Sequence, residues 1–395
     1  MLTSPDSRPG GAAMGRAFSS FIVCVSATLP AAPMTTANLN PEIPWLIYGA
    51  NGYSGRLIAE EAARRGLRPI VAGRDDDTIR GLGDTLGLLT RVFDLSHAAA
   101  IRRAIKGSRL VLHCAGPFSS TSRPMLDACL EMGIHYLDIT GEIDVFAACH
   151  SRSDDARERG VAVAPGVGFD VVPTDCVASL LRESLPDASS LTLGFEASGG
   201  PSVGTAKTSV EGLVRGGRVR RAGVLIEVPL AYKTRTFDRE GKPRLATTIP
   251  WGDVYTAYVT TGIPNIEVYM AASRSSVAFL RRLNWVRPLL RFKSVARFVQ
   301  ARTIATTKPP SAERRAQTNC YIWGEAMTPA GRVSRMEIET PNGYEFTVSS
   351  ALGVIEKFLG AEKVAGGYYT PSQLMGSRYA LTLPGVVLKS GPSLS

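Results

Sequence analysis

The sequence predicts an α/β fold, in which a doubly wound parallel sheet is followed by a second, mixed α+β domain. From Trp45 onward, short apolar runs alternate with segments of helical spacing, which is the pattern of repeated βαβ units. A glycine-rich turn joins the first apolar run to the first helical segment. The alternation ends near Asp175, and the length of 395 residues leaves room for a second domain after it.

The boundaries of the expected elements follow from this alternation. Strands are expected at 45–48, 69–72, 89–93, 110–114, 135–138 and 161–164, with helices at 54–65, 75–86, 96–106, 122–131 and 143–159. After these we expect a helix at 176–185 and strands at 190–196, 254–260 and 332–340. The predicted domains are a disordered leader or over-long gene start at 1–40, a nucleotide-binding domain at 41–172, a substrate domain at 173–350, and a C-terminal segment at 351–395 that packs back on the first domain.

The first predicted strand leads into the turn Gly49-Ala50-Asn51-Gly52-Tyr53-Ser54-Gly55. Glycines between a strand and a helix let backbone N–H groups approach a pyrophosphate, which then lies on the positive end of the helix. The GxxGxxG spacing alone is common, and a plain tight turn is the alternative. Its place before five further βα units favours a Rossmann-type domain. We therefore expect the cofactor to contact Gly49, Asn51, Gly52, Tyr53, Ser54 and Gly55.

The end of the second strand favours NADP(H) as the cofactor. An NAD site usually holds an acidic residue there for the ribose hydroxyls, whereas this chain has Arg74, which suits a 2′-phosphate. A solvated surface role is the alternative for Arg74. Asp75 is expected to cap the next helix. Asp94, after the third strand, can accept a hydrogen bond from the adenine amino group or cap a helix.

The fourth strand ends in Cys114-Ala115-Gly116-Pro117, at the carboxyl edge where cofactor and substrate meet. All four residues are predicted to contact the cofactor. Cys114 is expected to be a packing residue, because no neighbour in the sequence would lower the pKa of its thiol. No tyrosine is followed by a lysine four residues later, which excludes the proton-transfer pair of short-chain dehydrogenases. The catalytic residue therefore stays unknown at this point.

Together with the glycine turn, several later motifs resemble the saccharopine dehydrogenase-like oxidoreductases, and in particular their trans-acting enoyl reductase branch. These motifs are Ala72–Arg74, Cys114–Phe118, Tyr136–Glu142, Pro165–Asp175, Gly199–Ser209, Cys320–Glu325 and Thr370–Leu374. His113 stands where the family often has asparagine. The resemblance implies a second domain that closes over the cofactor. It also implies substrate contacts at Phe118, Asp170, Gly204, Thr205 and Lys207.

The resemblance implies NADPH-dependent reduction of a lipid-like enoyl thioester that is carried on a separate synthase. Donors near Gly116 to Phe118 and Gly204 to Lys207 would then stabilise the developing enolate. A saccharopine-type amino-acid dehydrogenase and a non-catalytic NADP-binding protein at lipid surfaces are the alternatives, because a fold alone does not decide function.

The formal net charge of +10 favours contact with an anion. No nucleic-acid-binding motif accompanies the charge, and the 6 cysteines and 4 histidines lack zinc-ligand spacing, so we expect neither nucleic acid nor a metal. The basic, amphipathic stretch 277–303 suits an acidic carrier protein or an anionic membrane surface, and a helix packed on its own domain is the alternative. The leader resembles neither a secretory signal nor a membrane span, so we expect a cytoplasmic location, with peripheral membrane contact and a homodimer left open.

Overall fold

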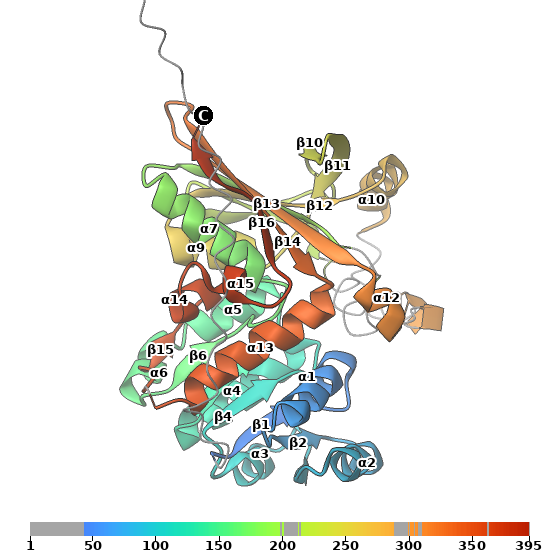
Figure 1. Ribbon diagram of the computed structural model, residues 1–395, viewed down its shortest axis with the longest axis vertical. Coiled ribbons are helices and arrows are strands. Elements are labelled where there is room, and N and C mark those ends of the chain that lie inside the picture. Colours follow the sequence, from blue (N-terminus) through green and yellow to red (C-terminus); the bar gives the residue numbers. More distant parts are fainter. Residues whose placement is uncertain are drawn as a thin grey trace, which may run out of the picture. The chain divides into compact units, whose positions relative to one another are not determined.

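The computed structural model describes residues 43–197, 215–287, 310–361 and 363–394, together with residues 200, 212, 299, 301–303 and 305–306. The expected leader at 1–40 lies outside the described residues. Two β-sheets with their helices make up the described part of the chain (Figure 1).

The first sheet has seven parallel strands in the order β15-β6-β5-β4-β1-β2-β3. Its strands are β1 (Trp45–Tyr48), β2 (Ile70–Gly73), β3 (Thr90–Val92), β4 (Leu110–His113), β5 (His135–Asp138), β6 (Ala162–Ala164) and β15 (Gly367–Tyr368). Because β1 lies between β2 and β4, the chain winds in both directions from the centre. The predicted doubly wound sheet is confirmed.

Helices cover both faces of this sheet, which explains why its strands are apolar throughout. They are α1 (Tyr53–Arg64), α2 (Asp76–Leu86), α3 (Ala98–Ile105), α4 (Phe118–Met132), α5 (Ile143–His150) and α6 (Ser153–Glu158). Side chains alternate along β1: Trp45 and Ile47 enter a core with α1 and α2, while Leu46 and Tyr48 enter a core with α3 and α4.

The second sheet is mixed, with the strand order β10-β11-β12-β7-β13-β14-β16. Its strands are β7 (Ser190–Glu196), β8 (Gly217–Arg221), β9 (Val224–Val228), β10 (Thr234–Arg239), β11 (Lys242–Thr248), β12 (Asn265–Ala271), β13 (Asn319–Met327), β14 (Val333–Pro341) and β16 (Val387–Leu394). β12 and β7 are parallel, β8 pairs with β12 and β9, and the other pairs are antiparallel. Apolar side chains of α7 (Val172–Ser184) and α9 (Asp253–Thr261) form one core with this sheet. The predicted mixed second domain is also confirmed.

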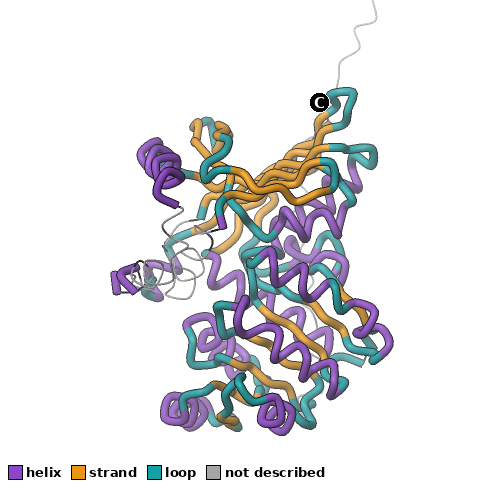
Figure 2. Tube along the Cα trace, turned by 180° about the vertical axis from the view of Figure 1, so that it is seen from behind, coloured by secondary structure: helices purple, strands orange, loops and turns teal. Residues whose placement is uncertain are grey.

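The last part of the chain contributes to both sheets (Figures 1 and 2). Helix α13 (Gly343–Leu359) packs against α1, and β15 pairs with β6 at the edge of the parallel sheet. Strand β16 then pairs with β14 of the second sheet. The remaining described helices are α10 (Arg274–Val286), α12 (Ala312–Ala316), α14 (Pro371–Met375) and α15 (Tyr379–Thr382).

The strand predicted at 254–260 is wrong, because this segment is helix α9. Its β-branched and aromatic residues favour a strand, but Gly262 ends a helix in the left-handed conformation with φ of +71°. Val254, Ala257 and Thr261 are buried at helical spacing. Tertiary packing therefore overrides the local preference. The helix predicted at 143–159 is likewise two helices, α5 and α6.

Close packing in the second sheet makes Gly194 a test of the fold. Gly194 of β7 lies opposite Trp323 of β13, and a Cβ at Gly194 would overlap the indole ring. We expect Gly194→Ala to lower the free energy of unfolding by about 1–3 kcal/mol through overpacking. Gly81 in α2 faces open space, so Gly81→Ala should raise it by about 0.5–1 kcal/mol. Urea unfolding measures both, and a Gly194→Ala variant as stable as the wild type would contradict the packing.

Candidate active site

The glycine-rich turn joins β1 to α1 at the centre of the parallel sheet. Gly49 has a φ of +80°, a conformation that favours glycine, and its N–H donates to the carbonyl of Ala72 over 2.8 Å. A Cβ at Gly49 would lie 2.8 Å from the Cβ of Ala115, and one at Gly55 would overlap the carbonyl oxygen of Gly49. Because neither position carries a side chain, the turn can pack closely against both α1 and the loop after β4.

The N-terminus of α1 opens at this turn. Gly52 is the N-cap, without a side-chain cap, and the first helical hydrogen bond runs from Arg56 N to Gly52 O over 2.8 Å. The N–H groups of Tyr53, Ser54 and Gly55 consequently have no partner among the described residues. Free amides at the positive end of a helix are the donors that a pyrophosphate needs, so the turn fits a dinucleotide.

The side chain of Tyr53 joins the turn to the second half of the chain. Its hydroxyl donates to the carbonyl of Pro310 over 2.6 Å and accepts from Arg315 Nη1 over 2.8 Å. Its ring meets Tyr344 edge to face, with 4.8 Å between centroids. Arg315 also donates to Glu345 over 2.8 Å. Only the backbone of Tyr53 is therefore available to a cofactor, since the hydroxyl is already engaged.

The side chains that follow β2 and β3 differ in whether they form hydrogen bonds within the protein. Arg74 is exposed and has no hydrogen bond or ion pair to any described residue. Asp75 accepts from Thr78 N over 3.0 Å and caps α2, which confirms the predicted cap. Asn51 Nδ2 donates to Thr78 Oγ1 over 3.1 Å. The Asp94 carboxylate accepts from Ser96 N over 2.6 Å, so it holds a turn before α3, and an adenine contact stays a prediction.

The loop after β4 lies beside the glycine turn, as the contact between Ala115 and Gly49 shows. This places Cys114, Ala115, Gly116 and Pro117 at the switch point between β1 and β4, where open α/β sheets bind their ligands. Burial, together with the charge of Asp138, raises the pKa of the Cys114 thiol. Cys114 is therefore a neutral thiol, in agreement with a packing role.

Of the donors expected to stabilise an enolate, the amide of Phe118 is already engaged, and a role of the others stays a prediction. Phe118 N and Ser119 N both donate to the carboxylate of Glu142, each over 2.8 Å. Glu142 therefore caps α4 from the loop after β5, and these amides have no capacity left for a substrate. The cap also explains why α4 starts at Phe118, ahead of the predicted start at 122. The ring of Phe118 lies in the core, 5.3 Å from that of His113.

His113 is fully buried at the end of β4. Burial lowers its pKa to about 3, so the imidazole is neutral at physiological pH. Its Nε2 lies 3.0 Å from Thr121 Oγ1, and the Thr121 hydroxyl can donate to the carbonyl of Ala115 over 2.6 Å. Because the Thr121 hydroxyl proton is used in that bond, Nε2–H of His113 donates to Thr121 Oγ1. His113 thus stabilises the loop after β4 through Thr121.

Two aspartates lie at the carboxyl ends of β5 and β6: Asp138 is the last residue of β5, and Asp170 lies in the loop after β6. Asp138 accepts from Thr140 N and Gly166 N, both over 2.9 Å, and from the hydroxyl of Tyr136 over 2.8 Å, so it ties the two loops together. Asp170 is partly exposed. Its Oδ2 lies 2.9 Å from the position of a Cβ on Gly141, and its carbonyl accepts from Trp251 Nε1 over 2.7 Å. The carboxyl edge therefore continues from the glycine turn to Asp170.

Three predicted substrate residues lie outside the described part of the chain. Other residues make contacts in the site that the sequence did not predict. Gly204, Thr205 and Lys207 lie outside the described residues. Glu142 and Asp138 belong to a motif that the resemblance identifies, but their partners are distant in the sequence. Arg315 meets Tyr53 across 262 positions, and nothing in the sequence marks that pair.

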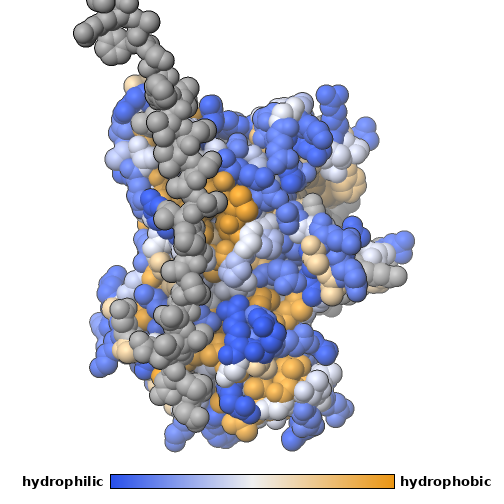
Figure 3. Space-filling view, viewed as in Figure 1, coloured by the Kyte–Doolittle hydropathy of each residue, from blue (hydrophilic) through white to orange (hydrophobic). Residues whose placement is uncertain are grey.

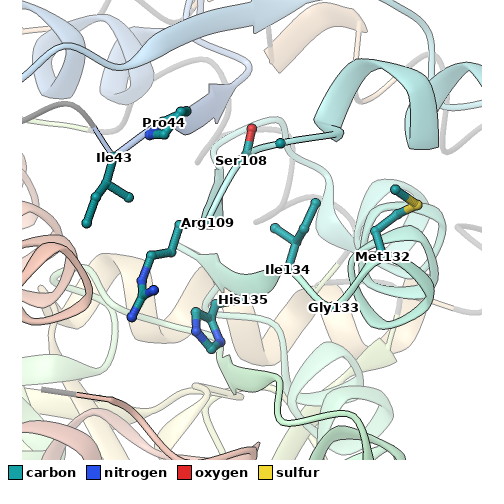
Figure 4. Close-up of a pocket in the computed structure, with 9 residues that line it drawn as sticks. Ile43, Pro44, Ser108, Arg109, Met132, Gly133, Ile134 and His135 are labelled. Carbon is teal, nitrogen blue, oxygen red and sulfur yellow. The ribbon is translucent and has the colours of Figure 1, made fainter.

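A surface pocket of about 430 Å³ lies elsewhere, at the amino-terminal edge of the parallel sheet (Figure 4). Its lining comes from the starts of β1, β4 and β5: Ile43, Pro44, Gly107, Ser108, Arg109, Met132, Gly133, Ile134 and His135. Arg109 donates to the carbonyl of Phe358 over 2.9 Å, and His135 Nδ1 accepts from Ala162 N over 2.9 Å. These groups serve the fold, and the pocket is at the opposite end of the strands from the glycine turn.

Comparison with known families finds a match for the nucleotide-binding part of the chain. Residues 45–163 match the saccharopine dehydrogenase NADP binding domain. The match covers 119 of the 395 residues, so the likeness is that of this one domain. Its cofactor is NADP(H), as the sequence predicts, and the free amides of the turn and the unpaired Arg74 fit that cofactor.

Individual relatives resemble the same part of the chain. A mouse saccharopine dehydrogenase-like oxidoreductase is 28% identical over 152 residues, which is 33% of this chain and 35% of the relative. A trans-acting enoyl reductase of Mycobacterium ulcerans is 31% identical over 166 residues, which is 39% of this chain and 38% of the relative. The alignments thus span little more than a third of these relatives.

A solved structure extends the likeness in fold to most of the chain. Apo saccharopine dehydrogenase (L-Glu forming) from Saccharomyces cerevisiae superposes with a TM-score of 0.58 at 11% identity, covering 89% of this chain and 99% of that one. At this identity the likeness concerns the fold, in which a second sheet follows the NADP-binding domain.

Two kinds of feature are absent from the described part of the chain. No group of histidine, cysteine, aspartate and glutamate side chains there could hold a metal ion. Among the same residues, no helix has both the length and the apolar character that a membrane crossing requires.

The exposed, unpaired Arg74 should set the preference for NADPH over NADH. A charge-assisted hydrogen bond to the 2′-phosphate would be lost in Arg74→Ala, and we expect the NADPH affinity to fall about tenfold or more while that for NADH stays the same. Arg80→Ala removes the same charge from α2 and should leave both affinities unchanged. Fluorescence titration of both cofactors measures this, and equal wild-type affinities for NADPH and NADH would refute the assignment.

Proposed function

We propose that the protein is an NADPH-dependent reductase of a lipid-like enoyl thioester. The match to the saccharopine dehydrogenase NADP binding domain supports an NADP(H)-dependent oxidoreductase, and trans-acting enoyl reductases at 31% identity support the finer assignment. The observation that carries the proposal is the charge of the carboxyl edge. Residues 110–118, 138–142, 164–175 and 249–254 include no lysine or arginine.

The charge of this edge supports one of the two candidate substrate classes over the other. A dicarboxylic amino acid would need convergent basic groups to bind both of its carboxylates. These described loops instead carry Asp138, Glu142, Asp170 and Asp253, together with the aromatic Trp251. An uncharged thioester meets no repulsion there. The edge therefore favours an enoyl thioester over a saccharopine-type substrate.

The chain's own residues divide the work of binding and orientation. The amides of Tyr53, Ser54 and Gly55 would hold the pyrophosphate, and Arg74 the 2′-phosphate. The close packing of Gly49 on the β4 loop would let the nicotinamide end lie over β4 and β5. Bound NADPH supplies a hydride. The segment at Trp251, held on the Asp170 carbonyl, would limit the access of water.

Turnover of cofactor with a defined acyl substrate tests the proposal. We expect NADPH consumption, followed at 340 nm, with trans-2-enoyl thioesters of pantetheine or coenzyme A, and a product heavier by two hydrogens in mass spectrometry. Reduction of NADP⁺ by saccharopine, without thioester turnover, would favour the amino-acid dehydrogenase. Binding of NADPH without turnover of either substrate would favour a non-catalytic role.

The delivery of a lipid-like substrate is the second part of the proposal, and helix α10 carries it. α10 and its C-cap contain Arg274, Arg281, Arg282 and Arg287 without an acidic residue. Trp285 is 89% exposed and Phe279 63% exposed. Figure 3 shows one face of the molecule, on which hydrophilic residues surround several apolar patches. Exposed aromatics beside arginines suit the interface of an anionic membrane, which we propose as the partner of this helix. Most of 288–303 lies outside the described residues.

Binding to lipid vesicles should depend on α10 and on salt. We expect vesicles containing phosphatidylserine to bind the protein and shift the emission of Trp285 to shorter wavelength, and pure phosphatidylcholine vesicles not to do so. Arg282→Glu with Trp285→Ala should abolish binding in a sedimentation assay, and salt should weaken it. Arg103→Glu, on the exposed side of α3, is the matched control. Binding that survives the double change, or capture only by an acyl carrier protein, would refute the membrane proposal.

A further inference from the structure

The carboxyl groups around the cofactor edge differ in what holds them. Asp138 accepts three hydrogen bonds, Glu142 caps α4 through both oxygens, and Asp175 accepts from Thr260 Oγ1 over 2.6 Å and Ser372 N over 2.8 Å. Asp253 is fully buried, 2.7 Å from Thr174 Oγ1. Each of these acids therefore has a structural role that a change of protonation would disturb.

Asp170 is different because its carboxyl group has no hydrogen bond to any described residue, although it is partly accessible. Gly141 leaves room for it: Oδ2, Cγ and Cβ of Asp170 lie 2.9, 3.3 and 3.2 Å from where a Cβ on Gly141 would be. The residue itself is anchored through its backbone, by Trp251 Nε1. The side chain thus occupies the space that Gly141 leaves open, while its oxygens have no hydrogen-bond partner among the described residues.

The position of Asp170 at the carboxyl edge of the parallel sheet places it near the reacting end of a bound dinucleotide. The loops at the carboxyl edge follow the order β1, β4, β5, β6 away from the glycine turn. A dinucleotide with its pyrophosphate at α1 and its adenosine end toward Arg74 would direct its other end to β4 and β5. Asp170 follows β6 and contacts the β5 loop at Gly141, so it borders that end of the site.

Two other titratable groups at this edge that the structure describes, His113 and Cys114, are poor proton donors. His113 is buried and neutral, and the raised pKa of Cys114 makes its thiol a poor acid. Burial alone raises the pKa of Asp170 from 3.8 to about 7. A group of this pKa is half protonated near neutral pH, as a general acid should be.

We infer that Asp170 is the proton donor of the reduction, and this inference rests on the proposed function. Hydride from NADPH forms the new C–H bond at the β-carbon, the C=C π bond breaks, and its electron pair becomes the enolate of the thioester. The Asp170 O–H bond then breaks as its proton passes to the α-carbon. The products are the saturated thioester and NADP⁺, and the Asp170 carboxylate recovers a proton from water.

The acids packed around Asp170 reinforce this protonation state. Asp253 on α9 has a pKa raised well above its usual value by burial, with contributions from Asp175 and Asp170. Thr174 Oγ1 lies 3.0 Å from the Val171 carbonyl and can donate to it, so a protonated Asp253 can donate to Thr174 in turn. Asp138 and Glu142 lie on the β5 side. An ionised Asp170 would therefore gain no favourable charge from these neighbours.

The first experiment compares wild type, Asp170→Asn and the control Asp75→Asn in steady-state kinetics and NADPH titration. We expect Asp170→Asn to lower kcat with an enoyl thioester at least about 100-fold, with unchanged NADPH affinity. In the wild type, kcat/KM should fall as pH rises through about 7, because only the protonated acid donates. An Asp170→Asn variant with near-normal turnover and the same pH profile would overturn the inference.

The second experiment needs neither cofactor nor substrate. ¹³C NMR of aspartate carboxyls in the wild type should show Asp170 titrating near pH 7, and this holds even if the variant does not fold. Because the folded state binds this proton more tightly, ionisation should lower the Tm of the wild type relative to Asp170→Asn between about pH 4 and 7. Titration near pH 4 would overturn the inference. Titration near 7 without any thioester turnover by the wild type would instead locate the failure in the proposed function, and the role of Asp170 would fall with it.

Discussion

The contact between the glycine turn and the loop after β4 is the constraint on which the rest of the site depends. Gly49 reaches its left-handed conformation and lies against Ala115 only because neither it nor Gly55 carries a side chain. This approach brings the N-terminus of α1 and the end of β4 to one edge of the sheet. The free amides of α1, the position of Arg74 and the loops after β5 and β6 become parts of a single site for that reason.

Most carboxyl groups at the same edge of the sheet hold the backbone in place. Glu142 satisfies the first amides of α4, and Asp138 joins two loops, so most carboxylates here stabilise the backbone. Burying these acids is costly unless they are hydrogen-bonded or protonated. Asp170 is the exception: its carboxyl group lies in the space beside Gly141 and has no hydrogen bond to any residue that the structure describes.

Much of this architecture could be predicted from local sequence patterns, and the failures share one physical cause. The apolar runs predict β1 to β6, and the glycine turn and Arg74 predict the NADP-binding domain, because these signals are local. The segment 254–260 was misassigned because its helix depends on packing against the second sheet. The Glu142 cap and the Tyr53–Arg315 contact join residues far apart in the sequence, and the raised pKa of Asp170 depends on burial. None of these leaves a pattern in the chain itself.

The return of the chain to the parallel sheet has a consequence for its synthesis. β15 and α13 complete that sheet and its core, yet they come from the last part of the chain, after nearly all of the second sheet. During translation, the apolar face of α1, with Ile58, Ala59 and Ala62, must therefore wait for α13 to emerge. A ribosome stalled before residue 343 would hold a nascent nucleotide-binding half with an uncovered apolar face, which is a surface that chaperones bind.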